Sequence, residues 1–123
     1  MSEGEKAMAT ARRTVGRPET LTEILETTRM ELDYLKERYG VERLAIYGSF
    51  AKGRGRKRSD VDILVDLRKP LGFDFMHLAD HLEQVLGRKV DLATFQTMKR
   101  SKQQPRYKHV VEDIEKTMVY VEA

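Results

Sequence analysis

Cysteine is absent from the 123-residue chain, which rules out disulfide bonds and zinc sites built on thiolates. Long apolar runs are also absent, and none approaches the length of about 20 residues that a helix needs to span a bilayer. The first residues, MSEGEKAMATARR, lack the apolar centre of a secretory signal peptide. We therefore expect a cytoplasmic protein.

Aromatic residues are scarce, at 7%, yet apolar residues make up 40% of the chain, which favours a folded core over disorder. A chain of this length has room for one domain. Residues 1–17 are small, polar and aperiodic, and Pro18 follows them. We expect residues 1–17 to form a flexible arm and residues 18–123 to form the folded domain.

Positive charge is concentrated in one segment. The formal net charge is only +3, but residues 52–58 (KGRGRKR) contain five cations and no acid. Such a run fits a solvated loop, a polyphosphate site or a nucleic-acid contact. Composition leaves all three interpretations open.

Three helices are predicted from apolar residues that recur at helical spacing. The first is about 19 residues long, because Thr20 and Glu23 form a capping box at its start and Gly40 ends it. The second is expected over residues 73–86 and the third over residues 106–119. Their core faces should contain Phe73, Met76, Leu82, Val85 and Leu86 in the second, and Val110, Val111, Ile114 and Met118 in the third.

Three short strands are predicted, at residues 43–47, 61–67 and 89–93. The segment 61–67 (VDILVDL) alternates with the period of two that a half-buried strand requires. Residues 52–58 must form a loop, because they combine two glycines with five cations. The order helix, strand, strand, helix, strand, helix predicts an α+β fold with a small mixed sheet flanked by helices.

Asp60 and Asp62 are the first candidate site residues. On a strand, residues i and i+2 point to the same face and lie about 6.6 Å apart. Carboxylates this close repel each other unless a cation lies between them, and Mg²⁺ suits them because it completes its shell with water and phosphate oxygens. Asp66 is in phase but farther along, so we leave it out of the site. A bare Asp-x-Asp also occurs on solvated strand faces.

Asp91 is the third candidate acid. It lies in the predicted strand KVDLA, and it would join the face of Asp60 and Asp62 if this strand lay beside residues 61–67. Taken alone, it is better explained as an exposed strand residue. Three carboxylates on one sheet surface favour a metal site with catalytic acids at Asp60, Asp62 and Asp91.

Gly48 and Ser49 follow the first predicted strand and are expected to bind phosphate. Glycine lets the backbone approach a ligand closely, and the serine hydroxyl can donate a hydrogen bond to a phosphate oxygen. A short helix near Phe50 would also turn its positive end toward an anion. Gly-Ser is common by chance, so the argument depends on its spacing from the acids, Gly-Ser-x10-Asp-x-Asp.

The stretch GSFAKGRGRKRSDVDILV resembles the signature of the DNA polymerase β-type nucleotidyltransferase superfamily. Over about residues 20–120, the chain resembles the stand-alone minimal members, the MNT-domain proteins. The resemblance is carried by Tyr47 to Ala51, Gly53, Ser59 to Asp62 and Gly87 to Leu92.

The resemblance implies a polymerase β-like nucleotidyltransferase fold and a role for each site residue. Asp60 and Asp62 would ligate two Mg²⁺ ions, and Asp91 would ligate one of them and help to deprotonate the attacking hydroxyl. Gly48 and Ser49 would hold the triphosphate, for which ATP is the expected substrate. The family's usual reaction transfers a nucleoside monophosphate from a triphosphate to a hydroxyl and releases pyrophosphate.

The resemblance also implies a partner. Many minimal members are antitoxins, similar in role to MntA-type proteins, which adenylylate a tyrosine of a HEPN-domain toxin encoded beside them. A chain of 123 residues has little surface for gripping a large acceptor, which favours an acceptor supplied by a partner protein. Two alternatives remain: a nucleotide-binding module that neutralises a partner without turnover, and a nucleotidyltransferase acting on a small molecule or RNA.

Overall fold

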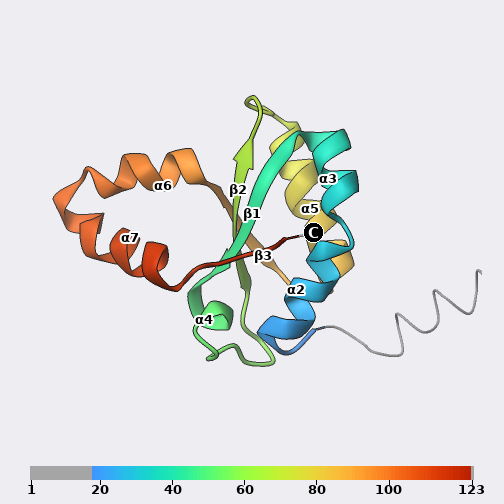
Figure 1. The fold of residues 1–123 in the computed structure, drawn as a ribbon, viewed down its shortest axis with the longest axis horizontal. Helices are drawn as coiled ribbons and strands as arrows, with labels where there is room; N and C mark the ends of the chain where they lie inside the picture. The colour runs from blue at the N-terminus through green and yellow to red at the C-terminus, as the bar shows by residue number, and fades with distance from the viewer. Residues whose placement is uncertain (1–17, 123) are drawn as a thin grey trace, which may run out of the picture.

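One four-stranded mixed sheet forms the centre of the protein (Figure 1). The computed structural model describes residues 18–122, so the expected arm, residues 1–17, lies outside the described residues. The strands are β1 (Val41–Tyr47), β2 (Val61–Leu67), β3 (Val90–Thr94) and β4 (Val119–Tyr120), in the order β3-β2-β1-β4. β1 runs antiparallel to both β2 and β4, whereas β2 and β3 are parallel.

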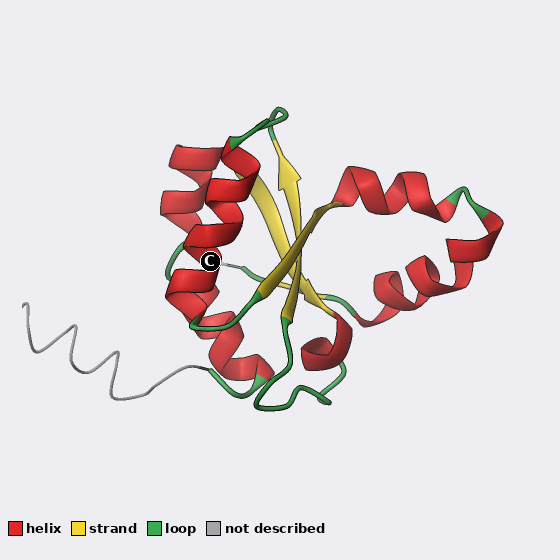
Figure 2. Cartoon of the chain, turned by 180° about the vertical axis from the view of Figure 1, so that it is seen from behind, coloured by secondary structure: helices red, strands yellow, loops and turns green. Residues whose placement is uncertain are grey.

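Helices cover both faces of this sheet (Figure 2). On one side lie α2 (Leu21–Arg29), α3 (Leu32–Tyr39) and α5 (Asp74–Leu86), and on the other lie α6 (Phe95–Lys102) and α7 (Pro105–Thr117). The single-turn helix α4 (Gly48–Ala51) follows β1 directly. The predicted α+β fold, a small mixed sheet flanked by helices, is confirmed.

β2 has buried side chains on both faces. Val61, Ile63 and Val65 are fully buried in the larger apolar cluster, which α2, α3 and α5 complete. Leu64 points the other way, into a smaller cluster with Ala45 and with residues of α6 and α7. Burial of a side chain of this size stabilises the fold by about 1.5–3 kcal/mol. The acidic residues at the ends of β2 therefore lie on a strand that is anchored on both faces of the sheet.

The first predicted helix is divided in two. α2 ends at Arg29 and α3 begins at Leu32, so the expected single helix of about 19 residues is wrong in its continuity. Inside α2, the buried Thr28 hydroxyl donates to the Ile24 carbonyl oxygen at 2.8 Å, a contact that tends to bend helices. The predicted capping box of Thr20 and Glu23 is present.

The core face of α5 differs from the prediction. Phe73 precedes the helix and is 88% exposed, and Met76 is 67% exposed, so neither belongs to the core. Leu82 and Leu86 are buried as expected, together with Leu78. Apolar residues lie on two sides of the first turn, so the sequence allowed two different faces of the helix to be buried. Packing against the sheet buried the face that contains Leu78.

The C-terminal part contains more elements than periodicity indicated. α6 was not predicted, and α7 ends at Thr117, where the chain leaves as the short strand β4 beside β1. On α7, Val111 is buried and Ile114 is partly buried, but Val110 is 57% exposed; Met118, which follows the helix, is partly buried. Within residues 18–122, no helix combines the length and apolarity needed to cross a bilayer.

Candidate active site

The sheet register places Tyr47, Asp62 and Asp91 in one row across three strands. Tyr47 on β1 is the register partner of Asp62 on β2, and Asp62 is the register partner of Asp91 on β3. Laterally paired residues of neighbouring strands point to the same face of a sheet. Asp60 lies immediately before β2, at the same end. The structure thus places the three acids that the sequence singled out at one end of the sheet.

Gly48 lies against Asp62. Its φ of +73° is a left-handed conformation that favours glycine, and a Cβ at this position would overlap the Asp62 Oδ2 atom. Ser49 follows on α4 and is partly buried. The two residues predicted to bind phosphate therefore border the acidic row.

Negative charge is crowded at this end of the sheet. Burial, followed by the carboxylates of Asp91 and Asp60, raises the pKa of Asp62 from 3.8 to about 6. Burial, followed by Asp91 and Asp62, raises the pKa of Tyr47 to about 12. Both shifts favour the less negative form of the group. Negative charge on these two groups is therefore disfavoured at this end of the sheet.

A magnesium ion fits the chemistry of these donors, although not as a cage made by protein alone. Among residues 18–122, no three acidic or histidine side chains converge into a group that could hold an ion by themselves. Mg²⁺, however, is usually bound through one or two carboxylates, with water and substrate phosphates as its other ligands. Asp62 and Asp91 offer such a pair, and a cation there would offset the burial and the carboxylate repulsion that raise the pKa of Asp62.

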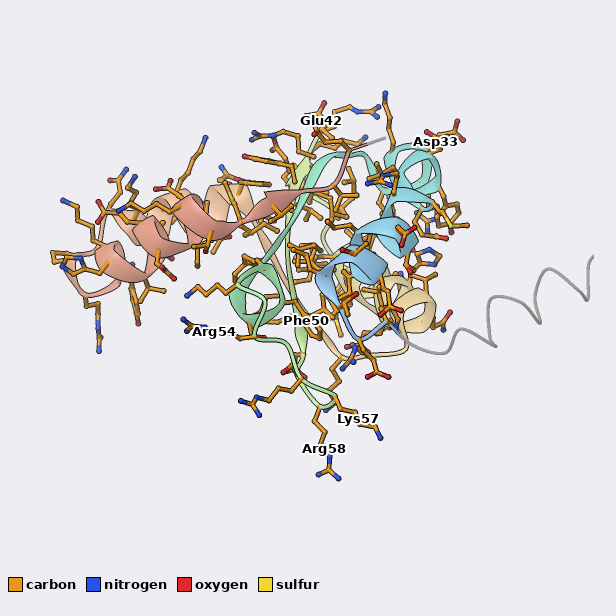
Figure 3. The ribbon with its side chains drawn as sticks, turned by 60° about the horizontal axis from the view of Figure 1, so that its bottom comes forward. Asp33, Glu42, Phe50, Arg54, Lys57 and Arg58 are labelled. Atoms are coloured by element: carbon orange, nitrogen blue, oxygen red, sulfur yellow. The ribbon has the colours of Figure 1, made fainter. Side chains whose placement is uncertain are left out.

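Cations gather on the loop between α4 and β2 (Figure 3). Arg54, Lys57 and Arg58 point outward from this loop, whereas Phe50 lies beneath it. Lys52 forms an ion pair with Asp113 of α7 and so ties the loop to the opposite helical layer. The positive charge predicted from composition thus lies on the loop that leads into Asp60 and β2.

Two residues at this end received no role from sequence reasoning. Tyr47 completes the row of side chains, and Arg88 is a buried arginine that contacts the loop. Both stand within the segments that carried the family resemblance, but spacing alone does not reveal a lateral pair or a buried guanidinium.

Sequence comparison relates the chain to a family of transferases. A family model described as a nucleotidyltransferase domain matches residues 29–121. The Methanocaldococcus jannaschii protein MJ1379, provisionally named a protein adenylyltransferase, is 37% identical over 105 residues, covering 83% of this chain and 98% of the relative. The protein adenylyltransferase MntA of Thermococcus cleftensis is 38% identical over 81 residues, covering 65% of this chain and 82% of MntA.

Solved structures agree with this relationship. One provisionally described as a minimal nucleotidyltransferase has a TM-score of 0.61 at 28% identity, covering 85% of this chain and 98% of its own. A toxin–antitoxin crystal structure with AMP-PNP has a TM-score of 0.57 at 17% identity, and the match covers 77% of this chain and 73% of the matched chain. The structure of a tri-AMPylated Shewanella oneidensis HEPN toxin in complex with an MNT antitoxin has a TM-score of 0.51 at 14% identity. The match covers 80% of this chain and 72% of the matched chain. At such low identity, these two complexes establish a shared fold only.

Proposed function

The chain belongs to the nucleotidyltransferase family, and we propose that it transfers AMP from ATP to a hydroxyl group of a partner protein. The observation that carries this proposal is the lateral pairing of Asp62 with Asp91, beside a glycine that has no room for a side chain. Carboxylates on neighbouring strands, next to a glycine backbone, suit the reacting end of a nucleoside triphosphate.

In this proposal Asp60, Asp62 and Asp91 hold two magnesium ions together with the phosphate oxygens. Bound magnesium supplies positive charge that stabilises the leaving pyrophosphate and lowers the pKa of the attacking hydroxyl. Asp60 is exposed and Asp62 is half-buried, so the pair can reach both solvent and the sheet surface. Gly48 admits the triphosphate close to the backbone, and the Ser49 hydroxyl donates to a phosphate oxygen.

The reaction forms one bond and breaks one. The acceptor oxygen attacks the α-phosphorus, and the bond from that phosphorus to the oxygen bridging the β-phosphate breaks. Pyrophosphate leaves with the electron pair of this bond. Asp91, which is exposed at the edge of the row, takes the proton of the acceptor hydroxyl.

A protein acceptor is supported by the relatives. MntA of Thermococcus cleftensis is named a protein adenylyltransferase, and one structural neighbour is an MNT antitoxin bound to an AMPylated HEPN toxin. We extend this to the present chain as an antitoxin that modifies a HEPN-type toxin, with a tyrosine as the acceptor. Asp60 and Asp91 are exposed, which suits a protruding segment of a partner more than a small acceptor.

Co-expression with the protein encoded beside it, followed by intact-mass spectrometry, tests the proposal. The partner should gain one or more adenylyl units with the parent chain and none with Asp62→Asn. Asp66→Asn is a matched control, because Asp66 also lies on β2 but pairs with Arg43, Oδ2 to Nε at 3.1 Å. It should leave the modification intact.

Other outcomes of this experiment select the alternatives. An unmodified partner that Asp62→Asn still neutralises would identify a binding module without turnover. Modification of a small molecule or RNA by the purified protein, with no protein acceptor, would retain the nucleotidyltransferase activity and exclude the antitoxin role.

Magnesium dependence has its own test, which needs no partner. ATP should raise the melting temperature only when a divalent ion is present. At an ATP concentration a hundredfold above its dissociation constant, binding should increase the free energy of unfolding by about 2.7 kcal/mol. Equal stabilisation by ATP with chelator and by ATP with magnesium would exclude the two-metal site.

A further inference from the structure

Arg88 is a buried cation with an unusual set of contacts. It lies between α5 and β3 and is 5% exposed, and it is the charged residue that the described part of the chain buries. A guanidinium removed from water is costly unless its N–H groups find acceptors. The acceptors that Arg88 finds therefore indicate what the residue does.

Most of these acceptors are main-chain carbonyl oxygens of the loop between α4 and β2, residues 52–60, which we call the basic loop. Arg88 Nη1 donates to the carbonyl oxygens of Lys57 at 2.6 Å, Arg56 at 3.2 Å and Ser59 at 3.3 Å. Its Nε donates to the carbonyl oxygen of Pro18 at 2.6 Å, at the start of the described chain. One side chain thus gathers backbone groups that lie 29 to 70 positions away in the sequence.

Phe50 supports the guanidinium from the other side. The guanidinium carbon of Arg88 lies 5.0 Å from the centroid of the Phe50 ring, within the range of a cation–π contact. Gly55 packs against the same ring so closely that a Cβ there would overlap it. The loop is therefore folded down onto a platform made by Arg88 and Phe50.

Contacts from residues 88 and 89 also reach the residues on either side of Asp60. Arg88 holds the carbonyl of Ser59, and the amide of Val61 donates to the carbonyl oxygen of Lys89 at 2.9 Å. Asp60 stands between these two held residues. The residue that carries the exposed carboxylate is thus fixed on both sides by residues 88 and 89.

We propose that Arg88 is a positioning residue, which closes the basic loop onto the protein and thereby sets Asp60 for metal and nucleotide. The role of Asp60 in this statement rests on the proposed function, whereas the closure of the loop does not. Lysine cannot replace arginine here, because a single ammonium group cannot donate in the separate directions of the loop carbonyls and Pro18.

Limited trypsin digestion tests the closure. The loop contains cleavable bonds after Arg54, Arg56, Lys57 and Arg58, and the bond after Arg68 in the β2–α5 connection serves as an internal reference. In Arg88→Lys, loop cleavage relative to the reference should rise about tenfold or more, because hydrogen bonds from a charged donor no longer hold the loop closed. An unchanged ratio would overturn the proposal.

Arg29→Lys is the matched control. Arg29 Nε also donates to a main-chain carbonyl, that of Glu122 at 2.8 Å, but on α2 and the C-terminal segment. This variant should keep the cleavage ratio of the parent. If Arg88→Lys does not fold, Gly55→Ala tests the same contact from the loop side, because a Cβ at Gly55 would overlap the Phe50 ring. Gly55→Ala should raise loop cleavage, and an unchanged ratio would again overturn the proposal.

The link to Asp60 is tested by magnesium titration in the presence of ATP. We compare the magnesium concentration at which half of the ATP-dependent rise in melting temperature is reached. This concentration should be about tenfold higher in Arg88→Lys, because removing a group that orients a metal ligand typically weakens metal binding by about that factor. A parent protein without any magnesium-dependent rise would overturn the proposed function, while the digestion result would still decide the closure. An opened loop with an unchanged magnesium midpoint would overturn the positioning of Asp60.

Discussion

Asp62 occupies the space that a side chain at Gly48 would need. The two residues belong to β2 and to the turn after β1, and a Cβ on Gly48 would overlap the Asp62 Oδ2 atom. The left-handed backbone of Gly48, with φ of +73°, adds a second reason for glycine. The carboxylate and the turn can therefore share this small volume only while residue 48 lacks a side chain.

Gly48→Ala should abolish magnesium-dependent ATP binding and should lower stability by more than the cost of its backbone conformation. Gly53→Ala separates the two effects, because Gly53 has the same φ of +73° but nothing within 4 Å of a Cβ. The control should lose about 1 kcal/mol and keep nucleotide binding. Thermal shift with magnesium and ATP measures both. Equal behaviour of the two variants would show that the contact with Asp62 does not matter.

Asp62 should make the stability of the metal-free protein depend on pH. Its pKa is raised from 3.8 to about 6 in the folded state, so the folded protein binds more protons than the unfolded chain between these values. The stabilising contribution is complete below about pH 4 and is lost as the pH rises through about 6. In chelator, the melting temperature of the parent should fall relative to that of Asp62→Asn between pH 4.5 and 7.5. A constant difference would show that burial and the neighbouring carboxylates do not raise the pKa of Asp62.

The outward-pointing cations of the basic loop should serve the partner. Replacing Arg54, Arg56 and Arg58 by serine should weaken partner association and reduce its salt dependence, with little change in KM for ATP. Arg68→Ser with Lys69→Ser, in the connection at the opposite end of β2, is the control and should change neither quantity. A raised KM for ATP with unchanged association would assign the loop to the triphosphate instead.

The α5 helix offers a test of the observed core face. Phe73→Ser should change the free energy of unfolding by no more than about 0.5 kcal/mol, because the side chain is 88% exposed. Leu78→Ala should cost about 2–5 kcal/mol, because Leu78 is fully buried. Urea denaturation of both variants measures the difference. A large loss for Phe73→Ser would restore the helical phase that periodicity predicted.

Local features of this protein were predictable from the sequence because they depend on residues close together in the chain. The alternation in β2 predicted its buried face, which contains Val61, Ile63 and Val65. The capping box at Thr20 and the stop at Gly87 predicted helix ends, as found. The Gly-Ser-x10-Asp-x-Asp spacing identified the end of the sheet where the candidate site lies.

Tertiary structure decided the features that depend on which distant segments meet. The parallel register of β2 and β3 brings Asp91 beside Asp62, whereas the local sequence around Asp91 favours an ordinary exposed strand residue. Packing against the sheet selected the phase of α5, and only the closed fold shows Arg88 donating to backbone groups up to 70 positions away. Hydrophobic period and capping act over a few residues, but lateral pairs and a buried guanidinium require the whole chain to be in place.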